Sequence, residues 1–129
     1  MLPRLSNVPQ LNNVVSDYLS ELQKQHFEGD IASNYADRLS LATDNSVYQQ
    51  LPQAILFPKS VADVVRITKL ANKEKYLHLT FTPRGGGTGT NGQSINNNII
   101  VDLSRHMTGI LELNIEERWV RVQAGVVKD

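Results

Sequence analysis

The residues best suited to chemistry lie in one short segment, residues 82–94, which reads Thr-Pro-Arg-Gly-Gly-Gly-Thr-Gly-Thr-Asn-Gly-Gln-Ser. This segment, the glycine loop, holds five of the chain's eight glycines and one cation, Arg84. Glycine loses more backbone freedom on folding than any other residue, so this density indicates that the backbone must approach something closely. Consecutive backbone N–H groups beside an arginine are typical of a site for an anion such as a phosphate.

Two nucleotide-binding motifs nearly fit the glycine loop, but its surroundings exclude both. Residues 87–92 satisfy the Gly-x-Gly-x-x-Gly pattern, and residues 87–94 match a P-loop except that Gln93 replaces the lysine. Both motifs hold phosphates at the start of a following helix, whereas only six residues separate Gly92 from the apolar strand at Ile99. The loop is therefore expected to join two strands and to suit a pyrophosphate. A flexible turn without a ligand is the alternative.

The chain before the loop predicts an α+β (mixed α/β) fold that begins with helices. Apolar residues at three- and four-residue steps predict an amphipathic helix over residues 10–25. Asp30 is placed to cap a second, shorter helix over residues 35–41.

A strand, a helix and a second strand are then expected. Residues 54–57 form a continuous apolar run that suits a buried strand. Ser60 followed by Asp63 predicts the start of a helix that reaches about residue 75, and residues 77–82 return to a strand. The short connections favour a parallel pair with a right-handed crossover. Beyond the loop, residues 98–103 predict another strand, and residues 110–113 and 119–124 predict a hairpin.

The composition excludes several classes of protein. Thirteen basic and thirteen acidic side chains among 129 residues balance, so no overall field favours nucleic acid. The absence of cysteine excludes disulfides, a thiol nucleophile and a cysteine-ligated metal within these residues. No apolar run approaches the ~18 residues of a transmembrane segment, and no signal peptide is visible. A cytoplasmic chain is expected, with peripheral association at the inner membrane left open.

Three motifs follow one another along the chain: Pro52-x-Ala54-Ile55-x-Phe57-Pro58-x-Ser60-x-x-Asp63-Val64, Pro83-Arg84-Gly85-Gly86-Gly87-Thr88-Gly89 and Ile100-Val101-Asp102-Leu103-Ser104-Arg105. Together they resemble the FAD-binding (PCMH-type) domain of the vanillyl-alcohol oxidase and p-cresol methylhydroxylase family, over about residues 44–125. Tyr35-Ala36-Asp37-Arg38-Leu39 and Thr43-Asp44-Asn45-Ser46 are most similar to the D-lactate and D-2-hydroxyglutarate dehydrogenase branch. Its large bacterial members fuse the flavin domain to a C-terminal iron–sulfur region.

The resemblance implies that the glycine loop wraps the pyrophosphate of FAD. The contacts, chiefly from main-chain amides, would come from Gly85, Gly86, Gly87, Thr88 and Gly89, while Arg84 and Gly92 would shape or close the loop. Some members bind flavin covalently through a histidine in this loop. Here Thr88 stands at that position, and His26, His78 and His106 all lie outside the loop, so non-covalent FAD is implied.

The resemblance also implies how the chain is divided and what it belongs to. Residues 1–42 would be a helical leader, and residues 43–129 the first part of the FAD-binding domain, truncated at its C-terminal end. The complete protein would be a 2-hydroxy-acid dehydrogenase of the D-lactate or D-2-hydroxyglutarate type that passes a hydride from substrate to FAD. Catalytic residues and any iron–sulfur cluster would lie beyond Asp129, and this chain alone would be inactive. No catalytic or metal-binding residue is assigned within it.

Two alternatives come from other classes of protein. In one, the chain is a non-enzymatic module that binds a nucleotide or another anion. In the other, it is an inert truncated chain whose unfinished sheet associates with a second copy of itself.

Overall fold

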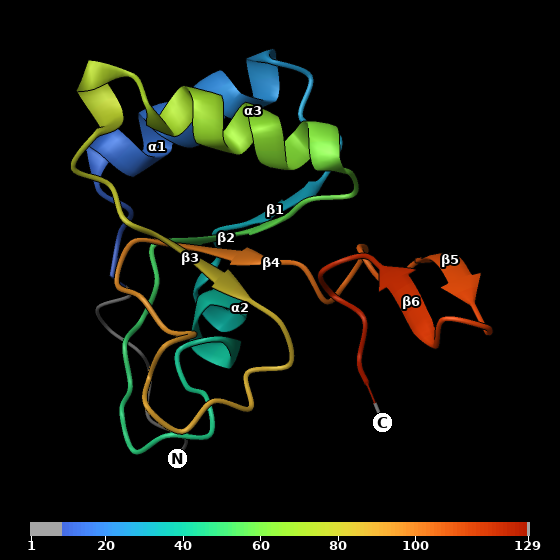
Figure 1. The fold of residues 1–129 in the computed structure, drawn as a ribbon. Coiled ribbons are helices and arrows are strands. Elements are labelled where there is room, and N and C mark those ends of the chain that lie inside the picture. Colours follow the sequence, from blue (N-terminus) through green and yellow to red (C-terminus); the bar gives the residue numbers. More distant parts are fainter. Residues whose placement is uncertain (1–8, 129) are drawn as a thin grey trace.

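The computed structural model describes residues 9–128 (Figure 1). Along the chain the elements are α1 (Asn13–Lys24), β1 (Asp30–Ala32), α2 (Tyr35–Ser40), β2 (Ala54–Phe57), α3 (Val61–Ala71), the 3-10 helix η1 (Glu74–Tyr76), β3 (Phe81–Arg84), β4 (Ile99–Asp102), β5 (Ile110–Asn114) and β6 (Trp119–Val122). A four-stranded sheet carries α1 and α3 on one face and α2 on the other, and the β5–β6 hairpin stands apart (Figure 1).

The four-stranded sheet has the order β1-β2-β4-β3. Strands β2, β4 and β3 run parallel, and β1 pairs antiparallel with β2. The register places Ile55 opposite Ile100 and Phe81 opposite Ile99. All four residues of β2 and all four of β4 are buried, as expected for strands that are covered on both faces.

The main hydrophobic core lies between the sheet and the helices α1 and α3. It includes Val15, Tyr18 and Leu22 from α1 and Ile67 and Leu70 from α3. The buried Tyr18 hydroxyl donates a hydrogen bond of 2.9 Å to the carbonyl oxygen of Ile67, which joins the two helices. Burial raises the pKa of the Tyr18 phenol, so it stays a neutral donor. A smaller cluster covers the other face of the sheet and comprises Ile55, Phe57 and Ile100, with Ala32 and Leu41 against them.

The three predicted helices are present, but the cap predicted for the second helix is wrong. The first predicted helix is confirmed as α1, whose N-cap is Asn12. Ser60 caps α3 as predicted, and its hydroxyl accepts a hydrogen bond from the N–H of Asp63 at 3.2 Å. The prediction that Asp30 caps α2 is wrong, because Asp30 begins β1 and Asn34 is the N-cap.

The predicted limits of α3 and β3 are also corrected. Helix α3 ends at Ala71, short of residue 75, because the chain tightens into η1. The strand begins at Phe81 instead of residue 77. Tyr76 and Leu79 are nevertheless buried, so the apolar pattern there reflects a packed turn and not a strand.

The strands β2 and β3 are parallel, as predicted, but they are not neighbours. Strand β4 lies between them and pairs with both. Its sequence Ile-Ile-Val-Asp is buried on both faces, which requires a central position. Strand β3 is partly exposed and contains Pro83, which cannot donate to a ladder and is tolerated at an edge.

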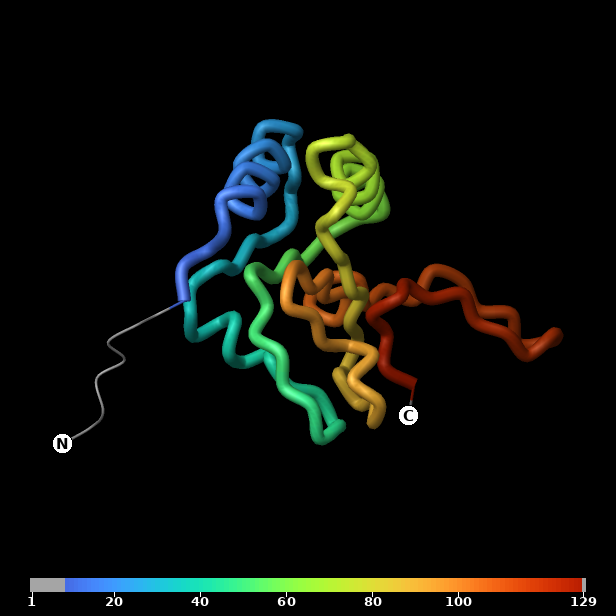
Figure 2. The backbone as a smooth tube through the Cα atoms, turned by 90° about the vertical axis from the view of Figure 1, so that its left-hand side faces the viewer, coloured from blue at the N-terminus to red at the C-terminus, as the bar shows by residue number. Residues whose placement is uncertain are grey.

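The β5–β6 hairpin extends away from the sheet (Figure 2). Its pairing places Leu113 opposite Val120 and Glu112 opposite Arg121, with a bulge between Ile110 and Glu112. Arg121 and Glu112 form an ion pair of 2.7 Å on one face. Leu113 and Val120 on the other face keep 65% and 50% of their surface exposed. Within residues 9–128, no helix is long and apolar enough to cross a membrane.

Candidate functional site

The glycine loop connects two parallel strands without a helix, as predicted. It leaves the C-terminal end of β3 at Arg84 and must return along the sheet to the start of β4 at Ile99. On the way it passes beside residues 43–50, which join α2 to β2 (Figure 1). Three hydrogen bonds support the loop: Asn45 N–H donates to the Gly87 carbonyl at 3.1 Å, Ser94 Oγ donates to Asp44 at 2.9 Å, and Arg84 donates to the Ser94 carbonyl at 3.4 Å.

Two of the loop's glycines are required by the conformation of the chain itself. Gly87 and Gly92 have φ angles of +66° and +75°, a region that other residues rarely adopt. A Cβ on Gly87 would also collide with the Arg84 guanidinium. A Cβ on Gly89 would meet only the end of the flexible Gln93 side chain. Gly87 and Gly92 therefore give the loop its shape.

The first two glycines of the loop, Gly85 and Gly86, have no such reason within the protein. Neither has a positive φ angle. A Cβ on Gly85 would meet nothing within 4 Å, and one on Gly86 would be 3.6 Å from the Thr88 methyl group, an ordinary contact. Both residues are exposed. Their small size is explained by a group outside the chain that approaches the backbone closely.

The N–H groups next to these glycines are available to such a group. In the described part of the chain, no hydrogen bond joins the N–H groups of residues 85–89 to another protein atom. These are five successive donors at the exposed end of a strand. Such a row can form a cradle for an anion when its N–H dipoles point their positive ends toward the same ligand.

Arg84 adds positive charge to this cradle. Its guanidinium lies against Gly87 and donates to the Ser94 carbonyl at 3.4 Å. Among residues 9–128, it forms no ion pair with a carboxylate. The charge of Arg84 therefore remains available to an anionic ligand.

Asp44 supports the loop from the neighbouring segment. Its carboxylate accepts hydrogen bonds from the Ser46 N–H and from Ser94 Oγ, each at 2.9 Å. Hydrogen bonds from Ser46, followed by those from Ser94, lower the pKa of Asp44 to about 2. Asp44 is thus an anion at neutral pH whose charge is already satisfied by two donors.

A polar pocket of about 390 Å³ lies between the loop and this segment. It is lined by Ser40, Thr43, Asp44, Asn45, Arg84, Gly87 and Thr88. The structure therefore brings together three of the predicted site residues, Arg84, Gly87 and Thr88. Gly92 lies farther along the loop, near Tyr48.

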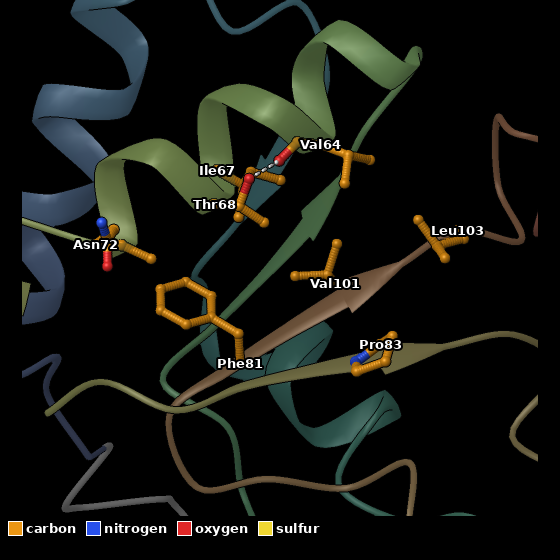
Figure 3. Close-up of a pocket in the computed structure, with 9 residues that line it drawn as sticks. Val64, Ile67, Thr68, Asn72, Phe81, Pro83, Val101 and Leu103 are labelled. Carbon is orange, nitrogen blue, oxygen red and sulfur yellow. Dashed lines mark hydrogen bonds between the residues drawn. The ribbon is translucent and has the colours of Figure 1, made fainter. Parts of the chain in front are cut away.

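A second pocket, of about 450 Å³, lies on the opposite face of the sheet under α3 (Figure 3). Its lining is almost entirely apolar and comprises Val64, Ile67, Thr68, Ala71, Asn72, Phe81, Pro83, Val101 and Leu103. It contains no charged side chain and is unsuited to an anion.

The three histidines lie outside the glycine loop. His26 and His78 are exposed. His106 is half-buried, and its Nε2 atom lies 2.6 Å from Asp30 Oδ2. This hydrogen bond is the largest of the causes that lower the pKa of Asp30. Within residues 9–128, no cluster of three or more histidine, cysteine, aspartate or glutamate side chains could hold a metal ion.

Asp44, Asn45 and Ser94 were not predicted as site residues. Thr43-Asp44-Asn45-Ser46 is recognisable in the sequence as a turn, and the hydrogen bond from Ser46 N–H to Asp44 is the local signal of that turn. Its contact with Ser94, however, joins residues 50 positions apart. No local pattern indicates that pairing.

Comparisons with known proteins agree with this geometry. Residues 52–129 match the family model described as an FAD binding domain. The chain is 81% identical over its whole length to a D-2-hydroxyglutarate dehydrogenase of Haemophilus influenzae, and 58% identical to that of Escherichia coli. It spans 13% of the length of each of these relatives.

A solved structure shares the fold. Alkyldihydroxyacetonephosphate synthase superposes with a TM-score of 0.75 over 93% of this chain and 25% of its own, at 19% sequence identity. This confirms the predicted mixed α+β fold of a PCMH-type FAD-binding domain.

Proposed function

Because the chain belongs to the family of FAD binding domains, we propose that its glycine loop holds the pyrophosphate of non-covalently bound FAD. The five free N–H groups of residues 85–89 are the observation that carries this proposal. The Thr88 hydroxyl can add a sixth donor, and Arg84 supplies a positive charge.

The fit of a pyrophosphate is supported by the two exposed glycines. Gly85 and Gly86 leave a surface that side chains would otherwise fill, although the chain itself has room for them. A pyrophosphate that approaches the backbone there can accept several N–H hydrogen bonds at once. Gly87 and Gly92, with their positive φ angles, keep the row of donors in place.

We further propose that the intact protein oxidises a D-2-hydroxy acid, with D-2-hydroxyglutarate as the first substrate to test. Support comes from the two D-2-hydroxyglutarate dehydrogenases to which the chain is 81% and 58% identical. Bound FAD supplies the electron acceptor for this oxidation. The residues of this chain bind and orient the cofactor, and the groups that act on the substrate belong elsewhere in the intact protein. A cytoplasmic location is part of the same proposal.

Gly85→Asp in the intact protein tests the site without disturbing the fold. A Cβ at residue 85 meets no protein atom within 4 Å, and the added carboxylate would repel a pyrophosphate bound to the neighbouring N–H groups. The loss of two charge-assisted hydrogen bonds at about 1.5 kcal/mol each predicts FAD binding about 100-fold weaker. Flavin fluorescence on titration with FAD measures the affinity, and urea denaturation of the apoprotein measures the stability.

Asn97→Asp is the matched control, because it adds the same charge at an exposed residue outside the glycine loop. It should bind FAD as the wild-type protein does. Wild-type affinity in Gly85→Asp would contradict the proposed site. If the wild-type protein instead bound pyrophosphate or ATP as tightly as FAD, the non-enzymatic anion-binding module would be the better interpretation.

Acid precipitation of the holoprotein tests the mode of attachment. Non-covalent FAD should remain entirely in the supernatant. Yellow colour in the washed pellet would contradict this part of the proposal.

A further inference from the structure

Most of the glycine loop has no regular secondary structure to hold it. Between Arg84, the last residue of β3, and Ile99, the first of β4, the backbone forms bends and turns. The donor row of residues 85–89 therefore depends on contacts with other segments for a fixed shape. Two of these contacts come from the turn that begins at Asp44.

Asp44 connects that turn to the far end of the loop. One carboxylate oxygen accepts from the Ser46 N–H at 2.9 Å, which fixes the turn, and the other accepts from Ser94 Oγ at 2.9 Å. Ser94 is 7% exposed, and its hydrogen bond to the half-buried Asp44 is partly removed from water, so the loss of the acceptor would leave a buried hydroxyl without its partner.

The same turn also holds the centre of the donor row. Asn45, the residue after Asp44, donates its N–H to the carbonyl of Gly87 at 3.1 Å. Gly87 is the middle residue of the five whose N–H groups are free. A carboxylate that fixes the turn thus fixes the orientation of the peptide groups beside the proposed anion site.

Resting on the proposed FAD site, we propose that Asp44 is a positioning residue that latches the glycine loop through Ser94 and through the turn carrying Asn45. Asp44 is not a ligand of the cofactor, since a carboxylate would repel a pyrophosphate and both of its oxygens are already occupied. Its low pKa keeps it an acceptor for both donors at neutral pH.

Three variants of the intact protein test the latch. Asp44→Ala removes both acceptors and should weaken FAD binding by about tenfold or more, the effect of losing hydrogen bonds to a charged group. Asp44→Asn keeps an oxygen for the Ser46 N–H and a polar group for Ser94, so it should recover most of the affinity. Ser94→Ala should weaken binding, and the double variant Asp44→Ala/Ser94→Ala should be less impaired than the product of the two single effects.

Hydrogen exchange of the apoprotein provides a readout that does not need FAD. Asp44→Ala should speed exchange at the hydrogen-bonded N–H groups of Asn45 and Ile95, and Asp44→Asn should not. Asp17→Ala is the control, because it removes an exposed carboxylate of α1 that pairs with Lys75 at 3.6 Å. It should leave both readouts unchanged.

The outcomes separate this inference from the proposed function. Wild-type FAD affinity and wild-type exchange in Asp44→Ala would overturn the latch while leaving the FAD site intact. Failure of the wild-type protein to bind FAD would overturn the proposed function, and the exchange measurement would still decide whether Asp44 holds the loop. Equal losses in Asp44→Asn and Asp44→Ala would also overturn the latch as described.

Discussion

The two halves of the glycine loop contain the same residue type for different reasons. In the second half, Gly87 and Gly92 have positive φ angles, and Gly89 packs against Gln93. In the first half, Gly85 and Gly86 have no positive φ angle and have room for a Cβ. The second half needs glycine to fold, whereas the first half can be explained by a ligand.

This difference separates stability from binding within one short segment. A substitution in the second half changes the shape of the loop and so affects both properties. A substitution in the first half affects only the surface presented to the ligand. Gly85→Asp, described above, is therefore expected to change FAD affinity with little change in the free energy of unfolding.

Gly87→Val tests the second half of the glycine loop and should give the largest effect, on both stability and FAD retention. A β-branched residue at φ +66° is strained, and its Cβ would collide with Arg84. We expect the free energy of unfolding to fall by about 3 kcal/mol, with FAD retention lost as well. Urea denaturation of the apoprotein measures the first effect. Unchanged stability would show that the loop does not need glycine at this position.

Arg84→Gln should have an intermediate effect, mainly on affinity. The charge of Arg84 is not paired within the described residues, so its removal costs binding of an anion more than stability. We expect FAD affinity to fall about tenfold at low salt. In 1 M salt the difference from wild type should shrink, because a half-exposed charge is screened. Arg84→Lys keeps the charge and should retain most of the affinity.

Tyr18→Phe should give the smallest effect. In contrast to Gly85→Asp, it should change stability and leave FAD affinity unchanged. It removes the hydroxyl that donates to the Ile67 carbonyl in the core and leaves that acceptor unpaired. The expected loss is about 1 kcal/mol in the free energy of unfolding. FAD affinity under native conditions should not change, since Tyr18 is on the face of the sheet away from α2. A parallel loss of affinity would mean that core and loop are coupled.

Local signals in the sequence were sufficient for the helices and the buried strands. The apolar spacing in α1, the Ser60 cap and the run Ala54-Ile55-Leu56-Phe57 each involve residues close in sequence. The sequence predicts the wrong cap for the second helix, because Asp30 is a strong local signal for a turn. In the structure Asp30 belongs to β1, and that assignment depends on the pairing of β1 with β2. Only the tertiary structure reveals that pairing.

The order of the strands could not be predicted in the same way. A strand, helix, strand unit predicts parallel strands, but it does not say that a later strand will insert between them. The position of each strand in the sheet depends on how deeply the strand is buried. Strand β4 is buried on both faces, and β3 is not.

The prediction of the site had the same limit: local patterns could be recognised, but contacts between distant residues could not. The glycine loop was identified from its composition and its resemblance to FAD-binding domains, and the structure brings Arg84, Gly87 and Thr88 into one polar pocket. The turn at Asp44 was visible, but its partner Ser94 was not, because their contact spans 50 positions. The distinction between the two kinds of glycine likewise required the backbone angles.

The central position of β4 has a consequence for how the chain folds during synthesis. Strand β2 leaves the ribosome long before β4, and its partner residues Ile55 and Ile100 are separated by the whole of α3, β3 and the glycine loop. Until β4 emerges, β2 has an open edge and β3 has no neighbour in the sheet. Forming such distant pairs is slow, because a long segment must be closed before any contact is gained. The glycine loop is the last connection to close, so the segment proposed to bind the cofactor also completes the sheet.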